Sequence, residues 1–143
     1  MFEIRTNIVG TWKLIACDME YQDSGVREPY FKGRPASGYV VFTPEGRMMV
    51  LLVGGDREPG QNAEKQAALF RTMIAYTGRY RFEGDQFITA VDASWNEAWT
   101  GTEQVRFCSI CGDRLDIQTA WLPHPTDPDH RMIRGILSFE HAK

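Results

Sequence analysis

Apolar and polar side chains alternate along most of the chain, in short segments that turn residues separate. Successive side chains of a β-strand point to opposite faces, so a period of two predicts strands with one buried face. In 11–21 this alternation places Trp12 and Leu14 on one face and Cys17 on the other. The other segments that are typical of strands lie at 38–42, 47–52, 79–82, 87–92, 101–110, 115–119 and 132–140.

Short turns join most of these segments, as Thr43-Pro44-Glu45-Gly46 joins 38–42 to 47–52. Proline presets φ and glycine permits a positive φ, so this turn is expected to close a hairpin. About eight strands connected in this way can close into a barrel around one small ligand. We therefore predict a mostly β chain, a single domain over residues 1–143 that forms an antiparallel up-and-down β-barrel of about 8–9 strands. The alternative is an open, curled sheet packed on a helix.

The period changes to steps of three and four between Asn62 and Ala75, which indicates one amphipathic helix between the third and fourth strands. Asn62 is a suitable N-cap residue. Two roles stay open for this helix. It is either a lid hinged at Gly54-Gly55 or a fixed plug of the barrel.

Charge and cysteine content narrow the class of partner. The net charge is −3 and no basic stripe is present, which argues against nucleic acid. The start of the chain lacks the pattern of a signal peptide, and no apolar run approaches the ~18 residues of a membrane span. Three cysteines, an odd number, suit reduced thiols. We therefore expect a cytoplasmic protein that binds neither nucleic acid nor membrane; a homodimer is compatible with the sequence.

The richest candidate for a binding site is the stretch 94–99, where Trp95 and Trp99 alternate with polar residues such as Asn96. Apolar walls with a few orienting polar groups are typical of small-molecule pockets. The alternative is that the two tryptophans plug one end of the barrel and Asn96 is a turn residue. Both readings stay open.

Two further pairs are candidates for the same pocket. Tyr76 and Tyr80 supply hydroxyl groups just after the helix, although a role in the barrel wall is the simpler reading for each. Gln104 and Arg106 share one face of a strand, and a buried arginine needs an anionic or carbonyl partner. Because Val105 and Phe107 occupy the opposite face, the pattern favours Arg106 pointing outward.

Metal and cofactor motifs are weak. The cluster His124, Asp127, Asp129 and His130 lies in a proline-rich loop with irregular spacing, and Cys108 and Cys111 have no second ligand pair. No nucleotide-binding or nucleophile-elbow fingerprint is present. We predict no metal and no cofactor.

Several motifs in order along the chain resemble those of the bacterial and fungal lipocalin-like domain proteins, a calycin-type family. They are Gly10-Thr11-Trp12-Lys13-Leu14, Gly38-Tyr39, Thr43-Pro44-Glu45-Gly46-Arg47-Met48, Phe70-Arg71, Ile74-Ala75-Tyr76, Gly78-Arg79-Tyr80, Ala93-Ser94-Trp95-Asn96 and Gly101-Thr102-Glu103-Gln104-Val105-Arg106. The resemblance implies a barrel in which Trp12 closes the floor beneath a basic side chain, here Arg134 or His141. Members often carry histidine just before Ala-Ser-Trp-Asn, where this chain has Thr89 and Ala90.

Two functions follow as hypotheses. The first is a protein that binds one small hydrophobic or amphipathic molecule in the barrel cavity. The alternative is a cofactor-independent cyclase or isomerase of secondary metabolism that uses the same cavity. Catalysis needs a titratable group inside the barrel, for which Tyr76, Asp92 and Glu103 are the candidates. The absence of the family's histidines favours binding.

Overall fold

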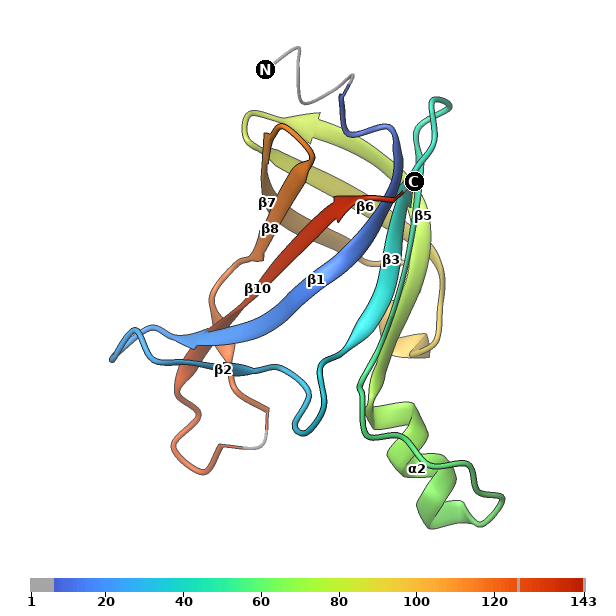
Figure 1. The fold of residues 1–143 in the computed structure, drawn as a ribbon, viewed down its shortest axis with the longest axis vertical. Coiled ribbons are helices and arrows are strands. Elements are labelled where there is room, and N and C mark those ends of the chain that lie inside the picture. The colour runs from blue at the N-terminus through green and yellow to red at the C-terminus, as the bar shows by residue number, and fades with distance from the viewer. Residues whose placement is uncertain (1–6, 126, 143) are drawn as a thin grey trace.

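The computed structural model describes residues 7–125 and 127–142, which form a closed antiparallel β-barrel (Figure 1). The elements with described bounds are β1 (Gly10–Tyr21), β2 (Arg27–Pro29), β3 (Ser37–Phe42), β4 (Arg47–Val53), α2 (Ala63–Arg71), β5 (Met73–Glu83), β6 (Gln86–Ser94), the 3-10 helix η1 (Glu97–Trp99), β7 (Glu103–Cys111), β8 (Arg114–Thr119), β9 (Leu122–Pro123) and β10 (Met132–His141).

Eight of these strands make the barrel, because β1 pairs with both β3 and β10 and so closes the sheet. The order around it is β1-β3-β4-β5-β6-β7-β8-β10. The short strands β2 and β9 add to the flanks of β1 and β10. The predicted barrel is confirmed, with α2 between its third and fourth strands. The turn expected between 38–42 and 47–52 is also present, with Gly46 at φ 96°.

A β-bulge in β1 changes which side chains point inward. The pairing of β1 with β10 shifts between Leu14 and Ala16, so the alternation changes phase there. Trp12 and Leu14 belong to the core, and Cys17 then packs against the same core. The expectation that Cys17 lies on the face opposite Trp12 is therefore wrong, because the extra residue of a bulge leaves no mark in the alternation pattern.

Trp12 is buried in the core of the barrel. Its side chain is 1% exposed, and its indole Nε1 donates a hydrogen bond to the Ile8 carbonyl oxygen at 2.8 Å. The ring centroids of Trp12 and His141 lie 4.0 Å apart. The basic residue over Trp12 is thus His141, whereas the Arg134 guanidinium lies 4.4 Å from the centroid of the Trp121 ring.

The helix α2 is shorter than predicted. Asn62 caps its N-terminus by accepting a hydrogen bond from the Lys65 amide at 2.8 Å, as expected. The helix ends at Arg71, because the following residues pair with β4 in register, beginning with Met73 opposite Val53. No residue of α2 is buried, and the helix projects away from the barrel (Figure 1).

Candidate functional site

The barrel encloses a cavity of about 520 Å³, within the range of small-molecule pockets. Strand alternation builds its wall: in β4, Met48, Val50 and Leu52 face the cavity, while Met49 and Leu51 are exposed on the outer face. The apolar residues that border it come from seven strands and include Val40, Met48, Val50, Leu52, Ile74, Phe87, Val105, Ile117, Ile133, Leu137 and Phe139. The site is therefore an apolar pocket built into the barrel wall.

Loop residues that the sequence patterns did not single out complete the lining. Tyr30, which follows β2, and Trp121, which follows β8, both border the cavity. The Trp121 ring is covered by the Arg134 guanidinium, which forms an ion pair with Glu20 at 2.7 Å. Alternation assigns no face to residues in loops. Only the presence of large aromatic side chains beside short strands could have drawn attention to these two.

Four of the seven candidate residues line the cavity, namely Tyr76, Trp99, Gln104 and Arg106. Tyr76 is buried in β5, and its ring centroid lies 5.2 Å from that of Trp99. The fold therefore brings together two aromatic residues that are distant in sequence. None of the residues of α2 is in the lining, so the helix is not a plug of this cavity.

The other three candidates lie beside the lining. Tyr80 packs edge-on against Phe42 in the barrel interior, with the ring centroids 5.2 Å apart. The Trp95 indole Nε1 donates to the carbonyl oxygen of Phe70 at 3.2 Å, which ties the end of α2 to the residue that follows β6. Asn96 caps η1, its Oδ1 accepting from the Ala98 amide at 3.1 Å.

Trp95 and Asn96 together hold Trp99 in place. The Trp95 and Trp99 rings meet edge to face with centroids 5.0 Å apart, and η1, which Asn96 caps, ends at Trp99. Aromatic pairs in this arrangement are stabilised beyond their buried area. The stretch 94–99 thus contains one cavity residue and two residues that position it.

Arg106 is on the inner face of β7, contrary to expectation. Cys108 is buried in the core and pairs with Ile117, and Arg106, two residues earlier, pairs with Thr119 of the same inner face. Phe107 is half-buried on the outer side. The expectation failed because apolar residues also occur on the outer face of this barrel, so that hydrophobicity alone does not identify the inner one.

A chain of hydrogen bonds along β7 holds the Arg106 side chain. The Thr102 hydroxyl donates to the Trp99 carbonyl oxygen at 2.7 Å, and Gln104 Nε2 donates to Thr102 Oγ1 at 3.0 Å. Arg106 Nη2 then donates to Gln104 Oε1 at 3.3 Å, and its Nη1 donates to the Val105 carbonyl oxygen at 2.9 Å. Among the described residues, the guanidinium therefore donates only to neutral groups.

Burial changes the acidity of two groups that line the cavity. It raises the pKa of the Cys17 thiol to about 12, with a smaller contribution from the negative charge of Asp18. Burial also raises the pKa of Tyr30, and the nearby Cys17 adds to this effect. The positive charge of Arg106 acts on Tyr30 in the opposite direction. Arg106 and Tyr30 are therefore electrostatically coupled.

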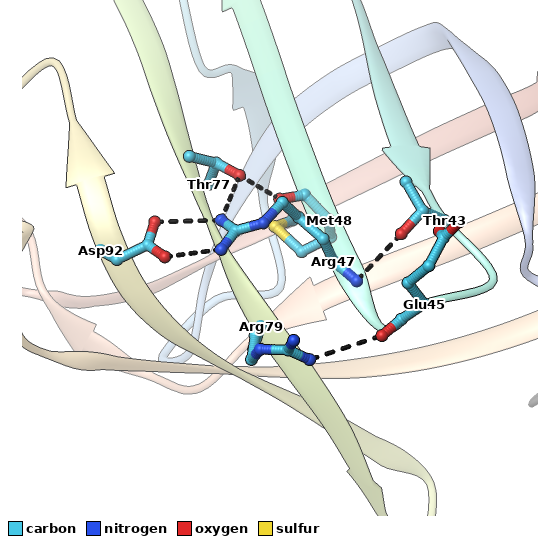
Figure 2. Close-up of polar contacts among 7 residues, drawn as sticks. All are labelled: Thr43, Glu45, Arg47, Met48, Thr77, Arg79 and Asp92. Carbon is cyan, nitrogen blue, oxygen red and sulfur yellow. Dashed lines mark hydrogen bonds and ion pairs between the residues drawn. The ribbon is translucent and has the colours of Figure 1, made fainter.

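The two carboxylates considered for catalysis are both ion-paired. Asp92 lies outside the barrel, where Arg47 reaches across β5 to it (Figure 2), and hydrogen bonds from Arg47 lower its pKa. Glu103 borders the cavity, but it pairs with Arg81 at 2.8 Å, and this hydrogen bond lowers its pKa. Of the three candidates, only Tyr76 is both buried and in the cavity lining.

The described residues contain neither a cluster of metal ligands nor a helix that could span a membrane. No three His, Cys, Asp or Glu side chains gather closely enough there to hold a metal ion. Among the same residues, no helix has the length and apolar character needed to cross a membrane.

Comparison with known proteins identifies the family. No curated protein matches the chain. The family model described as a lipocalin-like domain matches residues 9–142, which is nearly the whole chain and contains every strand of the barrel. This agrees with the closed barrel, with the buried Trp12 and with the apolar cavity described above. The chain therefore belongs to the lipocalin-like domain family.

Proposed function

We propose that this protein binds one small hydrophobic or amphipathic molecule inside its barrel. The observation that carries the proposal is the cavity of about 520 Å³ with a predominantly apolar wall. Burying some 300 Å² of apolar ligand surface contributes about 7 kcal/mol before entropic costs, at ~25 cal/mol per Å². Because a Kd of 1 μM corresponds to about 8.2 kcal/mol, micromolar affinity needs a larger buried area or polar contacts in addition.

Direct contacts to the ligand are proposed for Tyr76, Trp99, Gln104 and Arg106, because all four line the cavity. Trp95 and Asn96 are proposed to act through Trp99, and Tyr80 through its packing on Phe42. The proposal predicts that substitution of the first four changes affinity directly.

Native mass spectrometry of protein purified from its own host tests the proposal, since a retained ligand adds a discrete mass. Leu137→Trp fills the cavity from β10, whereas Leu51→Trp makes the same exchange on the exposed outer face of β4. We expect the wild type and Leu51→Trp to retain the adduct and Leu137→Trp to lose it. No adduct, together with no shift of the melting temperature across a library of lipophilic compounds, would contradict the proposal.

The cellular compartment, the partners and the domain organisation of the protein are also part of the proposal. Three free thiols, Cys17, Cys108 and Cys111, support a reducing compartment such as the cytoplasm. A homodimer, the lack of a nucleic-acid partner and the action of residues 1–143 as one domain are predictions from the sequence. Sedimentation analysis and limited proteolysis of the full chain test the first and the last.

A further inference from the structure

The cavity lining carries one positive charge without a matching negative one. Its charged residues are Glu103 and Arg106. Glu103 is neutralised by Arg81, which lies outside the lining. Arg106 forms no ion pair with a carboxylate of any described residue. The half-buried guanidinium therefore lies in the wall of an apolar pocket without a counter-charge.

Arg106 also keeps free hydrogen-bonding capacity. A guanidinium has five N–H donors. Two hydrogen bonds are described for this one, to Gln104 Oε1 and to the Val105 carbonyl oxygen. A partly desolvated arginine with unused donors is costly unless an acceptor reaches it.

The orientation of Gln104 is compatible with such a role. The Thr102 hydroxyl has one proton, which it donates to Trp99, so its oxygen accepts from the Gln104 amide nitrogen. The amide oxygen of Gln104 must then point to Arg106. Gln104 therefore holds the guanidinium without neutralising it.

The guanidinium and the amide group of the lining lie side by side on one strand. Gln104 and Arg106 share one face of β7, and Thr119 pairs with Arg106 from the end of β8. The walls contributed by β4 and β10 are apolar. The lining thus separates a head-group region on β7 from a region that suits a hydrocarbon body.

From this arrangement we infer that the ligand is an amphipathic organic monoanion whose carboxylate pairs with Arg106 while its apolar body fills the rest of the barrel. The planar fork of arginine matches a carboxylate with two parallel hydrogen bonds. One unmatched positive charge favours one negative charge, since a dianion would leave charge buried without compensation. The inference rests on the proposed function and adds the chemical class of the ligand.

Isothermal titration calorimetry with matched twelve-carbon probes tests this inference at low ionic strength and pH 8. The probes are dodecanoate, dodecanol and dodecyltrimethylammonium, which share a chain and differ in head-group charge. We expect dodecanoate to bind about tenfold to a hundredfold more tightly than dodecanol, as charge-assisted hydrogen bonds do, and the cation to bind most weakly. Added salt is expected to narrow the difference.

Three variants assign the preference to Arg106. Arg106→Met removes the charge, and Gln104→Glu places a carboxylate on the residue already bonded to Arg106. Both are expected to abolish the preference, so that dodecanoate and dodecanol bind to the variant with equal affinity. Arg79→Met, on an exposed residue outside the lining, is the matched control and is expected to retain the preference.

The possible results separate the inference from the proposed function. Equal binding of dodecanoate and dodecanol by the wild type overturns the inference and leaves the binding function intact. A preference that survives both Arg106→Met and Gln104→Glu also overturns it. If none of the probes binds and no lipophilic compound raises the melting temperature, the proposed function fails and the inference fails with it. Circular dichroism of each variant establishes that it is folded.

Discussion

The carboxylate of Asp92 accepts two hydrogen bonds from the guanidinium of Arg47, at 3.0 and 2.7 Å, across the strand that separates them (Figure 2). Asp92 occupies the bulge of β6, where the pairing with β5 passes from Ala93 opposite Thr77 to Val91 opposite Gly78. Arg47 also donates to the Thr77 hydroxyl at 3.2 Å, and Thr77 in turn donates to the Met48 carbonyl oxygen at 2.7 Å. Arg47 thereby links three neighbouring strands at an irregular point of the barrel wall.

This bridge gives a prediction for the pH dependence of stability. Hydrogen bonds from Arg47 lower the pKa of Asp92 below 3.8, so the pair stabilises the folded state above that pH and loses its effect as the pH falls through the lowered value. Asp92→Asn should lower the urea midpoint slightly at pH 7, because exposed pairs contribute little. The difference from wild type should vanish in strong acid. A difference that persists unchanged to pH 2 would show that the charge of Asp92 is not its cause.

We expect a substitution of Thr89 to stabilise the protein. Its side chain is fully buried, and its hydroxyl has no hydrogen-bond partner among the described residues. Thr89→Val keeps the shape and removes the unpaired oxygen, so the free energy of unfolding should rise by about 1 kcal/mol. Ser138→Ala is the control, because the Ser138 hydroxyl is also buried but donates to Asp116 at 2.7 Å. Urea denaturation should show opposite signs for the two variants, and equal losses would contradict the assignment.

The three thiols should differ in reactivity. Burial raises the pKa of Cys17 to about 12 and that of Cys108 to about 11, whereas Cys111 is exposed. Since the thiolate is the reactive form, a thiol reagent at pH 8 should modify Cys111 rapidly and the other two at least tenfold more slowly. Cys111→Ser should abolish the fast phase. Added ligand should slow the modification of Cys17, which lines the cavity, more than that of Cys108, which does not.

Trp12 should matter for stability and Trp99 for binding. Trp12→Phe removes the hydrogen bond to the Ile8 carbonyl oxygen and leaves a space beside His141, at a cost of about 2–3 kcal/mol in the free energy of unfolding. Trp99→Phe alters a half-buried residue of the cavity border and should cost less than about 1 kcal/mol. Chemical denaturation and probe titration of both variants check this division. A large loss of stability in Trp99→Phe alone would reverse it.

Local patterns predicted most of the fold. Alternation marked the barrel strands, the turn ending at Gly46 has the expected backbone, and Asn62 begins the helix as its side chain suggested. These features depend on neighbours in sequence, which a pattern records. The end of the helix could not be predicted in this way. Residues from Met73 onward pair with β4, a strand distant in sequence, and therefore do not form helical hydrogen bonds.

The site was less predictable than the fold. The face of Arg106 depends on the register of β7 against β8, whereas its apolar neighbours Val105 and Phe107 favoured the wrong face. The inward position of Cys17 depends on a bulge, and those of Tyr30 and Trp121 depend on how loops return over the barrel. Each of these is decided by contacts between distant segments.

The pairing of β1 with β10 has a consequence for the order of assembly. Trp12 pairs with His141, so the partners that close the barrel are nearly as far apart in sequence as the chain allows. Closing so long a loop is slow, and until β10 has been made and paired, the edges of β1 and β8 have open hydrogen-bonding groups. A nascent chain that lacks β10 therefore has no enclosed pocket and two edges prone to aggregation. Substitutions that slow this last step should reduce the yield of the protein in cells more than the stability of the finished barrel.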